Sequence, residues 1–133
     1  MFGYQSPVSL SVGQTITITS TQGEYWVIGT SQNGTASGTL TFTVASKLSQ
    51  GYTLSITGGS IVVAGTTYTL SGTAELGRMA NFMVGQGSTT PAGQFLLRAQ
   101  AAGSFGGTTG RVSLHLKSGA TEYAIVLSGT IQS

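Results

Sequence analysis

The sequence predicts an all-β domain of antiparallel strands, either a β-sandwich or a jelly-roll-like barrel, that spans residues 1–133 as a single domain. Apolar and polar residues alternate with period two through most of the chain, and the alternating segments are rich in β-branched and aromatic residues. Turns that contain glycine separate these segments at short intervals, which predicts nine or ten short strands. A chain of 133 residues without cysteine is long enough to bury a core without cross-links.

The N-terminal part divides into short alternating segments. We expect strands over residues 8–12, 14–20, 24–28 and 39–44. The stretch 31–38 contains Asn33-Gly34, a common hairpin signal, and is expected to turn. Within 39–44, Leu40, Phe42 and Val44 share one face, so we expect them to point into the core.

The middle of the chain reads as two successive hairpins. Tyr52, Leu54 and Ile56 share one face, and Gly58-Gly59 suits a two-residue turn because glycine adopts positive φ without strain. The run 61–64 does not alternate, so we expect that strand to be covered on both faces. A second turn near Gly65 follows, after which Tyr68 and Leu70 resume the alternation.

Residues 74–84 are compatible with either a short helix or a strand. Ala, Glu, Leu, Arg and Met all favour a helix, but Gly77 interrupts the segment. The glycine and proline in 85–93 predict a loop. After it we expect a meander of three strands at 94–101, 111–117 and 121–131, with a loop over 103–110. Their alternation points Phe95, Leu97, Ala99, Ala101, Val112, Leu114, Leu116, Tyr123, Ile125 and Leu127 inward.

Charged residues are scarce, at 6% of the chain against about 25% in typical soluble domains. The five basic residues are scattered instead of clustered, which argues against a nucleic-acid partner. No apolar run is long enough to span a membrane. A surface covered by hydroxyls instead of ions tolerates self-association and is typical of extracellular or cell-surface domains.

The N-terminal sequence MFGYQSPVSL lacks the basic and apolar regions of a secretory signal peptide. We expect the chain to be the mature segment of a secreted protein with an added Met1. The alternative is a protein that is not secreted by that route.

One set of residues resembles a catalytic triad, but its geometry argues against catalysis. Ser113, His115 and Glu122 would share the outer face of a hairpin. A four-residue turn over 118–121 would set Lys117 opposite Glu122, whereas a two-residue turn at Ser118-Gly119 would set His115 there. Ser113 and His115 are two residues apart on one strand, hence about 7 Å, which is too far for a nucleophile and its base. We expect a solvated cross-strand ion pair and no catalytic residues.

The sequence predicts no metal site and no cofactor. With one histidine, no cysteine and no aspartate, the common zinc and calcium patterns cannot be built. The glycine-rich stretches lack the lysine and hydroxyl residue that end a phosphate-binding loop, and they lack the third glycine of a dinucleotide fingerprint.

The best candidate for a binding site is Glu24-Tyr25-Trp26. In a strand, Glu24 and Trp26 point to one face and Tyr25 to the other. A glutamate beside an indole could hold a sugar by hydrogen bonds and stacking, with Tyr4, Tyr25, Tyr52 or Tyr68 adding to the platform. The alternative is that Trp26 belongs to the core and Glu24 marks the wet end of its strand. Separately, Asn33-Gly34-Thr35 matches the N-glycosylation pattern.

The segments LSQGYTLSITGGSIVVAGTTYTLSG (48–72) and GRVSLHLKSGATEYAIVLSGTI (110–131) resemble parts of small secreted or surface all-β proteins of archaea of the ammonia-oxidising kind. The resemblance extends over the C-terminal two-thirds of the chain and lies in the residue sequences of the strands and turns. It implies an extracellular location and a non-catalytic role, and it transfers no site residues.

These observations favour a non-enzymatic extracellular or surface domain that associates with copies of itself or with other surface proteins, as a filament, coat or matrix subunit does. The alternative is a carbohydrate-binding module. Residues 8–20 carry no charge, so this segment could add to a neighbour's sheet as an unguarded edge. The competing interpretation is that it pairs within its own domain.

Overall fold

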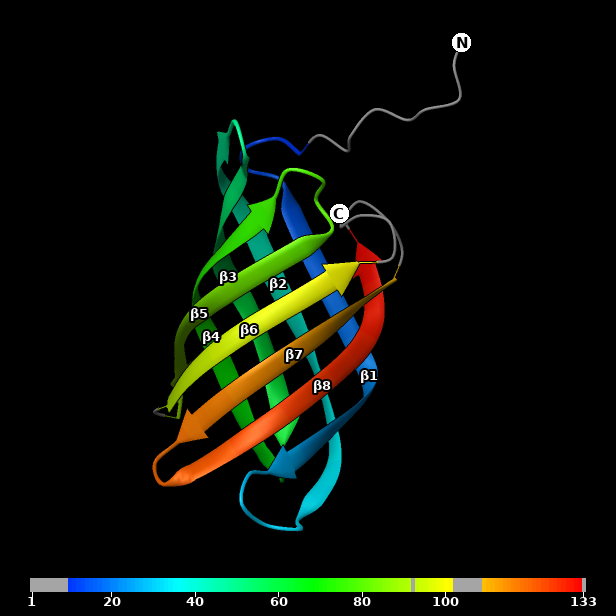
Figure 1. The fold of residues 1–133 in the computed structure, drawn as a ribbon, viewed down its shortest axis with the longest axis vertical. Coiled ribbons are helices and arrows are strands. Elements are labelled where there is room, and N and C mark those ends of the chain that lie inside the picture. Colours follow the sequence, from blue (N-terminus) through cyan, green and yellow to red (C-terminus); the bar gives the residue numbers. More distant parts are fainter. Residues whose placement is uncertain (1–9, 92, 102–108, 133) are drawn as a thin grey trace.

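The chain folds into a closed antiparallel β-barrel (Figure 1). The computed structural model describes residues 10–91, 93–101 and 109–132. Each strand pairs with the next one along the chain, and β8 returns to pair with β1. The eight strands are β1 (Thr15–Val27), β2 (Asn33–Leu48), β3 (Gly51–Val63), β4 (Thr66–Gly77), β5 (Phe82–Thr90), β6 (Gly93–Ala101), β7 (Thr109–Ser118) and β8 (Thr121–Gln132).

The prediction of an all-β antiparallel domain is confirmed, but its finer details are wrong. The sheet closes on itself as an up-and-down barrel, so it is neither a sandwich nor a jelly roll. It has eight strands instead of nine or ten, because several segments that we separated at glycines belong to one continuous strand. The described residues contain no helix.

β1 shows how two predicted strands become one. It unites the segments 14–20 and 24–28 through a β-bulge between Ser20 and Gly23. Of the predicted strand 8–12, residues 8 and 9 lie outside the described residues, and residues 10–12 form no strand. Leu10 is instead buried at one end of the barrel, where its backbone N–H donates to the Tyr52 hydroxyl at 3.1 Å.

The predicted turn at Gly58-Gly59 is a bulge within β3. Gly59 has a φ of 119°, and the pairing of β3 with β2 shifts by one residue at this point. The second predicted turn, near Gly65, is confirmed: the chain reverses at Ala64-Gly65, where both residues have positive φ, as a primed hairpin turn requires. Burial does alternate along the run 61–64, since Ile61 and Val63 are buried and Val62 is exposed. The expectation that this strand is covered on both faces is therefore wrong.

The segments 74–84 and 85–93 also differ from expectation. Residues up to Gly77 complete β4, residues 78–81 form a connection, and β5 begins at Phe82, so the helix alternative is wrong. The predicted loop 85–93 is mostly strand, since β5 runs to Thr90.

Two other predicted connections also differ from the structure. The expected turn over 31–38 is shorter, and β2 already begins at Asn33. The predicted loop 103–110 lies largely outside the described residues, and β7 begins at Thr109.

Glycine at inward-facing positions of β4 and β5 lets these two strands approach closely. Gly72 and Gly87 are directly paired. A Cβ atom built on Gly87 would lie 2.0 Å from the Ser71 carbonyl oxygen, and one built on Gly72 would lie 2.1 Å from that of Gln86. Such contacts are impossible for any other residue without a backbone shift, so these glycines allow the close approach of β4 and β5.

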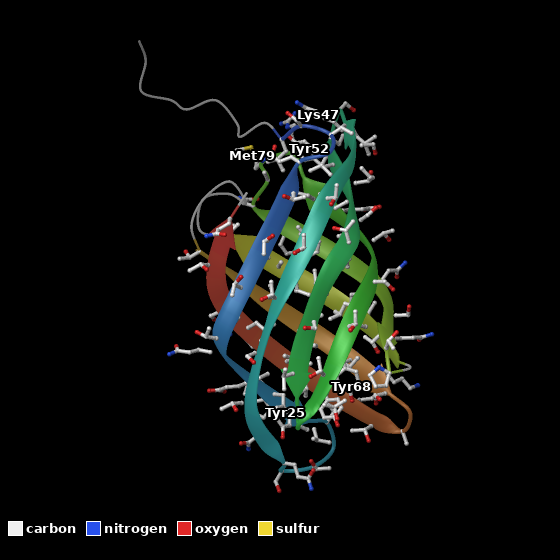
Figure 2. All side chains as sticks on the ribbon, turned by 180° about the vertical axis from the view of Figure 1, so that it is seen from behind. Tyr25, Lys47, Tyr52, Tyr68 and Met79 are labelled. Carbon is white, nitrogen blue, oxygen red and sulfur yellow. The ribbon has the colours of Figure 1, made fainter. Side chains whose placement is uncertain are left out.

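The barrel interior is filled by apolar side chains from every strand. An eight-stranded barrel is just wide enough for its inward side chains to fill it. The predicted inward residues of β2, β3, β4, β6, β7 and β8 are buried or partly buried, which confirms the period-two assignments for these strands. Tyr25 and Tyr68 lie at one end of the barrel, and Tyr52, Lys47 and Met79 lie at the other (Figure 2).

The outer face divides into two regions of different chemistry. On β1 and β2, three threonine pairs stand side by side, namely Thr15 with Thr43, Thr17 with Thr41 and Thr19 with Thr39. The ionisable side chains lie mostly elsewhere, on the outward positions of β4 and β6 to β8 and on the second half of β1. They are Glu24, Glu75, Arg98, Arg111, His115, Lys117 and Glu122.

Closure of the barrel removes the free edge that we considered for residues 8–20. Thr17, Ile18 and Thr19 pair with β2 on one side and with β8 on the other. The competing interpretation, pairing within the same domain, therefore holds for the strand residues of this segment. Any association with another copy must use a face or an end of the barrel.

Candidate functional site

The candidate site begins at the β-bulge of β1. Ser20 faces inward and is buried, and its hydroxyl lies 2.9 Å from the Gln22 carbonyl oxygen and 2.8 Å from that of Ser128. Gly23 occupies a position where a Cβ atom would lie 2.6 Å from a methyl group of Leu127. A buried hydroxyl and a glycine thus hold the extra residue of the bulge in place. Bulges of this kind commonly redirect side chains next to binding sites.

A hollow of about 500 Å³ lies on the outer face beside this bulge. Glu24 and Trp26 both line it, and the indole is 41% exposed, so Trp26 is not a core residue. The structure therefore places Glu24 and Trp26 on one outer face, as the strand period predicted. We call this the Trp26 hollow, and its lining consists of Thr21, Gln22, Gly23, Glu24, Trp26, Thr35, Arg111, Val126 and Ser128.

Arg111 was missed by the analysis of the sequence. It projects from β7, where it faces Ser128 of β8, which in turn faces Gln22 of β1. Arg111 and Glu24 line the same hollow, yet among the described residues neither takes part in an ion pair. No local signal in the sequence connects them, because their neighbourhood depends on the closure of β8 onto β1.

Tyr25 points away from this hollow into the barrel. Its ring packs edge-on against that of Tyr123, with centroids 5.8 Å apart. A Cβ atom on Gly34, the residue opposite on β2, would lie 2.7 Å from the Tyr25 ring, so glycine leaves the room that this ring occupies.

The other described tyrosines of the predicted platform do not reach the hollow either. Tyr52 and Tyr68 are buried, and Tyr4 lies outside the described residues. Tyr25, Tyr52 and Tyr68 thus do not share the face of Trp26, so none of these three described tyrosines adds to the predicted platform.

The interior tyrosines form a small cluster of Tyr25, Tyr68 and Tyr123. Burial raises the pKa of Tyr123 above its ordinary value of 10.0, and the proximity of Tyr68, a hydrogen bond to Tyr68 and the proximity of Tyr25 raise it further. Tyr123 thus stays protonated beyond the pH at which an exposed tyrosine ionises. The cluster supplies hydroxyl groups to one end of a mainly apolar interior.

Asn33, the predicted glycosylation acceptor, is exposed at the first position of β2. Its side-chain amide donates to the Ser31 carbonyl oxygen at 3.3 Å. In the register it stands opposite Trp26. Its modification stays a prediction.

The Ser113, His115 and Glu122 set forms an ion pair without a nucleophile beside it. Lys117 lies directly opposite Glu122, as the first of the two expected registers requires. His115 reaches Glu122 diagonally, with 3.2 Å between Nε2 and Oε1, and the two side chains are 44% and 42% exposed. The expected solvated cross-strand pair is confirmed, and such exposed pairs contribute little to stability.

A second depression lies mainly on the outer face of β4 to β7, and its lining also includes Ala45 of β2 and residues 53–55 of β3. It consists of two adjoining hollows of about 810 Å³ and 730 Å³ that share Thr73, Gln86, Leu96 and His115. We call it the β4–β7 groove. Val84 and Leu96, which line it, are 40% and 57% exposed. Glu75 and Arg98 stand on either side of Val84 in one cross-strand row, and within the described part of the chain neither forms an ion pair.

The described residues contain no group of three or more His, Cys, Asp or Glu side chains that could hold a metal ion. In the same part of the chain, no helix has the length and apolar character to cross a membrane.

Comparison with known proteins finds no match to a protein-family model, to a curated protein or to a solved structure.

Proposed function

We propose that this chain is a non-enzymatic interaction domain of an extracellular or cell-surface protein, which associates with copies of itself or with other surface proteins through the outer face of its barrel. Its role is structural, as in a filament, coat or matrix. This proposal retains the function expected from composition but replaces the route, since strand addition at residues 8–20 requires an edge that the barrel does not offer.

The observation that carries the proposal is the β4–β7 groove. Two exposed apolar side chains, Val84 and Leu96, line it together with polar residues, and the unpaired charges of Glu75 and Arg98 stand on either side of Val84. Apolar groups surrounded by polar ones are the usual composition of a protein contact surface. The low net charge of +2 adds little repulsion between copies.

A non-catalytic role is supported by the dispersal of the ionisable groups. General acid–base or nucleophilic catalysis needs two or more such groups within hydrogen-bond reach of one reacting atom. In the described residues, both side chains of the ion pair between His115 and Glu122 are exposed to solvent. Glu24 and Glu75 lie on β1 and β4, which are not neighbouring strands.

Light scattering across a range of protein concentrations, with electron microscopy of concentrated samples, tests the proposal. We expect assembly, and we expect Leu96→Lys and Val84→Lys to weaken it. Val62→Lys is the matched control, because Val62 is as exposed as Val84, at 40%, but lies on β3 outside the lining of the groove. A protein that stays monomeric at every concentration and salt condition would contradict the proposal.

The second candidate function is carbohydrate binding, and the Trp26 hollow favours it. An exposed indole beside unpaired charged groups is a typical surface for stacking and hydrogen-bonding a sugar ring. A screen of the protein on a glycan array tests this candidate, with Trp26→Ala as the variant that should lose any signal. Signals that persist in this variant would count against it.

A further inference from the structure

The Trp26 hollow presents an apolar surface beside hydrogen-bonding groups of both kinds. On the neighbouring strands the residues directly opposite Trp26 are Asn33 and Ala124. Both are small, and the indole keeps 41% of its surface exposed between them. An open indole face suits a ligand with a flat apolar side, such as the C–H face of a sugar ring.

The polar groups of the hollow complement hydroxyls. The carboxylate of Glu24 only accepts hydrogen bonds, whereas the guanidinium of Arg111 only donates them. Gln22 and Ser128 each do both, and they stand between these two charges. A sugar hydroxyl is donor and acceptor at once, so a ring with several hydroxyls can satisfy both ends of this arrangement.

The charges of the hollow also distinguish neutral from acidic ligands. Glu24 and Arg111 cancel in net charge, and neither is neutralised by an ion pair with another described residue. A carboxylated sugar would gain an ion pair with Arg111 but would be repelled by Glu24 in the same hollow. A neutral sugar gains charge-assisted hydrogen bonds from both groups without that repulsion.

From this geometry we infer that the Trp26 hollow binds a neutral hexopyranose of a polysaccharide, with Trp26 stacking on the ring and Glu24 and Arg111 hydrogen-bonding its hydroxyls. The inference rests on the second of the two functions proposed above and names its ligand class. The volume of about 500 Å³ lies within the range of small-molecule sites.

The protein offers a site-specific optical probe, since Trp26 is its one tryptophan. The probes are neutral pentasaccharides of β-1,4-linked glucose, N-acetylglucosamine or mannose, and an oligogalacturonate serves as the acidic counterpart. We expect at least one neutral probe to change the Trp26 emission in a saturable manner and to protect it from acrylamide quenching. We expect the oligogalacturonate to bind more weakly.

Calorimetric titration of variants then assigns the roles. Trp26→Ala should abolish binding, and Glu24→Gln or Arg111→Gln should each weaken it about tenfold or more, because each removes hydrogen bonds to a charged group. The matched controls are Glu75→Gln and Arg98→Gln, which change the same residue types at exposed positions in the β4–β7 groove. These two should leave the affinity unchanged.

The outcomes separate this inference from the carbohydrate-binding function on which it rests. Tighter binding of the acidic probe, or neutral binding that is unaffected by Glu24→Gln and Arg111→Gln, would overturn the inference while carbohydrate binding itself stands. Failure of every probe at millimolar concentration would overturn the inference together with the carbohydrate function. Self-association through the β4–β7 groove is measured separately and would survive both results.

Discussion

At the scale of single residues, polar groups inside the barrel sit where the backbone or another side chain gives them a partner. The single hydroxyl hydrogen of Ser20 has two backbone carbonyl oxygens within reach at the bulge of β1, those of Gln22 and Ser128. Tyr123 shares a hydrogen bond with Tyr68. Buried polar groups without partners would destabilise the fold, and among the described residues no buried side-chain nitrogen or oxygen lacks one.

The tyrosine cluster predicts a loss of stability at alkaline pH. The pKa of Tyr123 is raised in the folded state, so below about pH 10 both the folded and the unfolded chain keep this proton. As the pH rises above 10, the unfolded chain releases the proton first, and the free energy of unfolding falls. Urea unfolding at about pH 8, 10 and 11 measures this fall.

Tyr123→Phe should be less stable than the wild type at pH 8, since it loses the hydrogen bond to Tyr68, but should lose less stability between pH 10 and 11. The comparison between the two proteins removes the contribution of other groups that titrate in this range. Parallel curves for the two proteins would contradict the assigned pKa shift.

At the scale of secondary-structure elements, glycines and bulges decide how long each strand continues. We expected breaks at Gly23 and at Gly58-Gly59, yet both lie inside strands as bulges. Glycine in an alternating segment is compatible with a turn or with a bulge. Here the strand pairs with a neighbour on each side, and this pairing keeps the chain extended through a bulge. β5 illustrates the same effect, since its glycines at 85 and 87 leave the backbone free to pack closely against β4.

The close approach of β4 and β5 at Gly87 can be tested by adding one methyl group to this residue. Gly87→Ala would place Cβ 2.0 Å from the Ser71 carbonyl oxygen, so the strands must separate. We expect a loss of about 3 kcal/mol in unfolding free energy, at the upper end of common point mutations. Urea unfolding followed by circular dichroism measures it, and failure to fold would agree with the same steric cause.

Gly77→Ala is the matched control for Gly87→Ala. Gly77 lies on β4 as well, but the nearest atom to an added Cβ, the Phe82 carbonyl oxygen, is 3.8 Å away. We expect a change of about 0.5 kcal/mol or less. Equal effects of the two substitutions would show that the close approach of β4 and β5 does not limit the residue at position 87.

At the scale of the whole molecule, closure of the barrel removes both sheet edges and divides the outer face into regions. The threonine pairs of β1 and β2 lie apart from the β4–β7 groove, whose flanks carry Glu75 and Arg98. With the strand edges paired, contacts with a partner must involve side chains instead of backbone hydrogen bonds. This is why both proposed functions are assigned to surfaces.

Closure predicts a distinctive pattern of amide hydrogen exchange. Successive amides of β1 point alternately toward β2 and toward β8, so a strand at an open edge would leave every second amide unprotected. In the closed barrel we expect Ile18 and Thr19, and likewise Glu24, Tyr25 and Trp26, to be protected without alternation. Exchange measured by NMR tests this, and fast exchange at every second residue would contradict closure between β1 and β8.

The sequence by itself determined the all-β class and the inward or outward direction of most strand residues. Alternation along a strand is a local property, so Leu40, Phe42 and Val44 could be assigned to the core, and Glu24 and Trp26 to one face, without knowledge of any partner strand.

Only the tertiary structure decided the closure, the strand count and the Trp26 hollow. Closure pairs Trp26 of β1 with Ala124 of β8, and the next pairing places β7 and its Arg111 beyond β8. These pairings join segments about a hundred residues apart, as the pairing of Thr19 with Thr130 shows. Their free energy comes from enclosing one shared apolar interior, which no single segment of the chain can do alone.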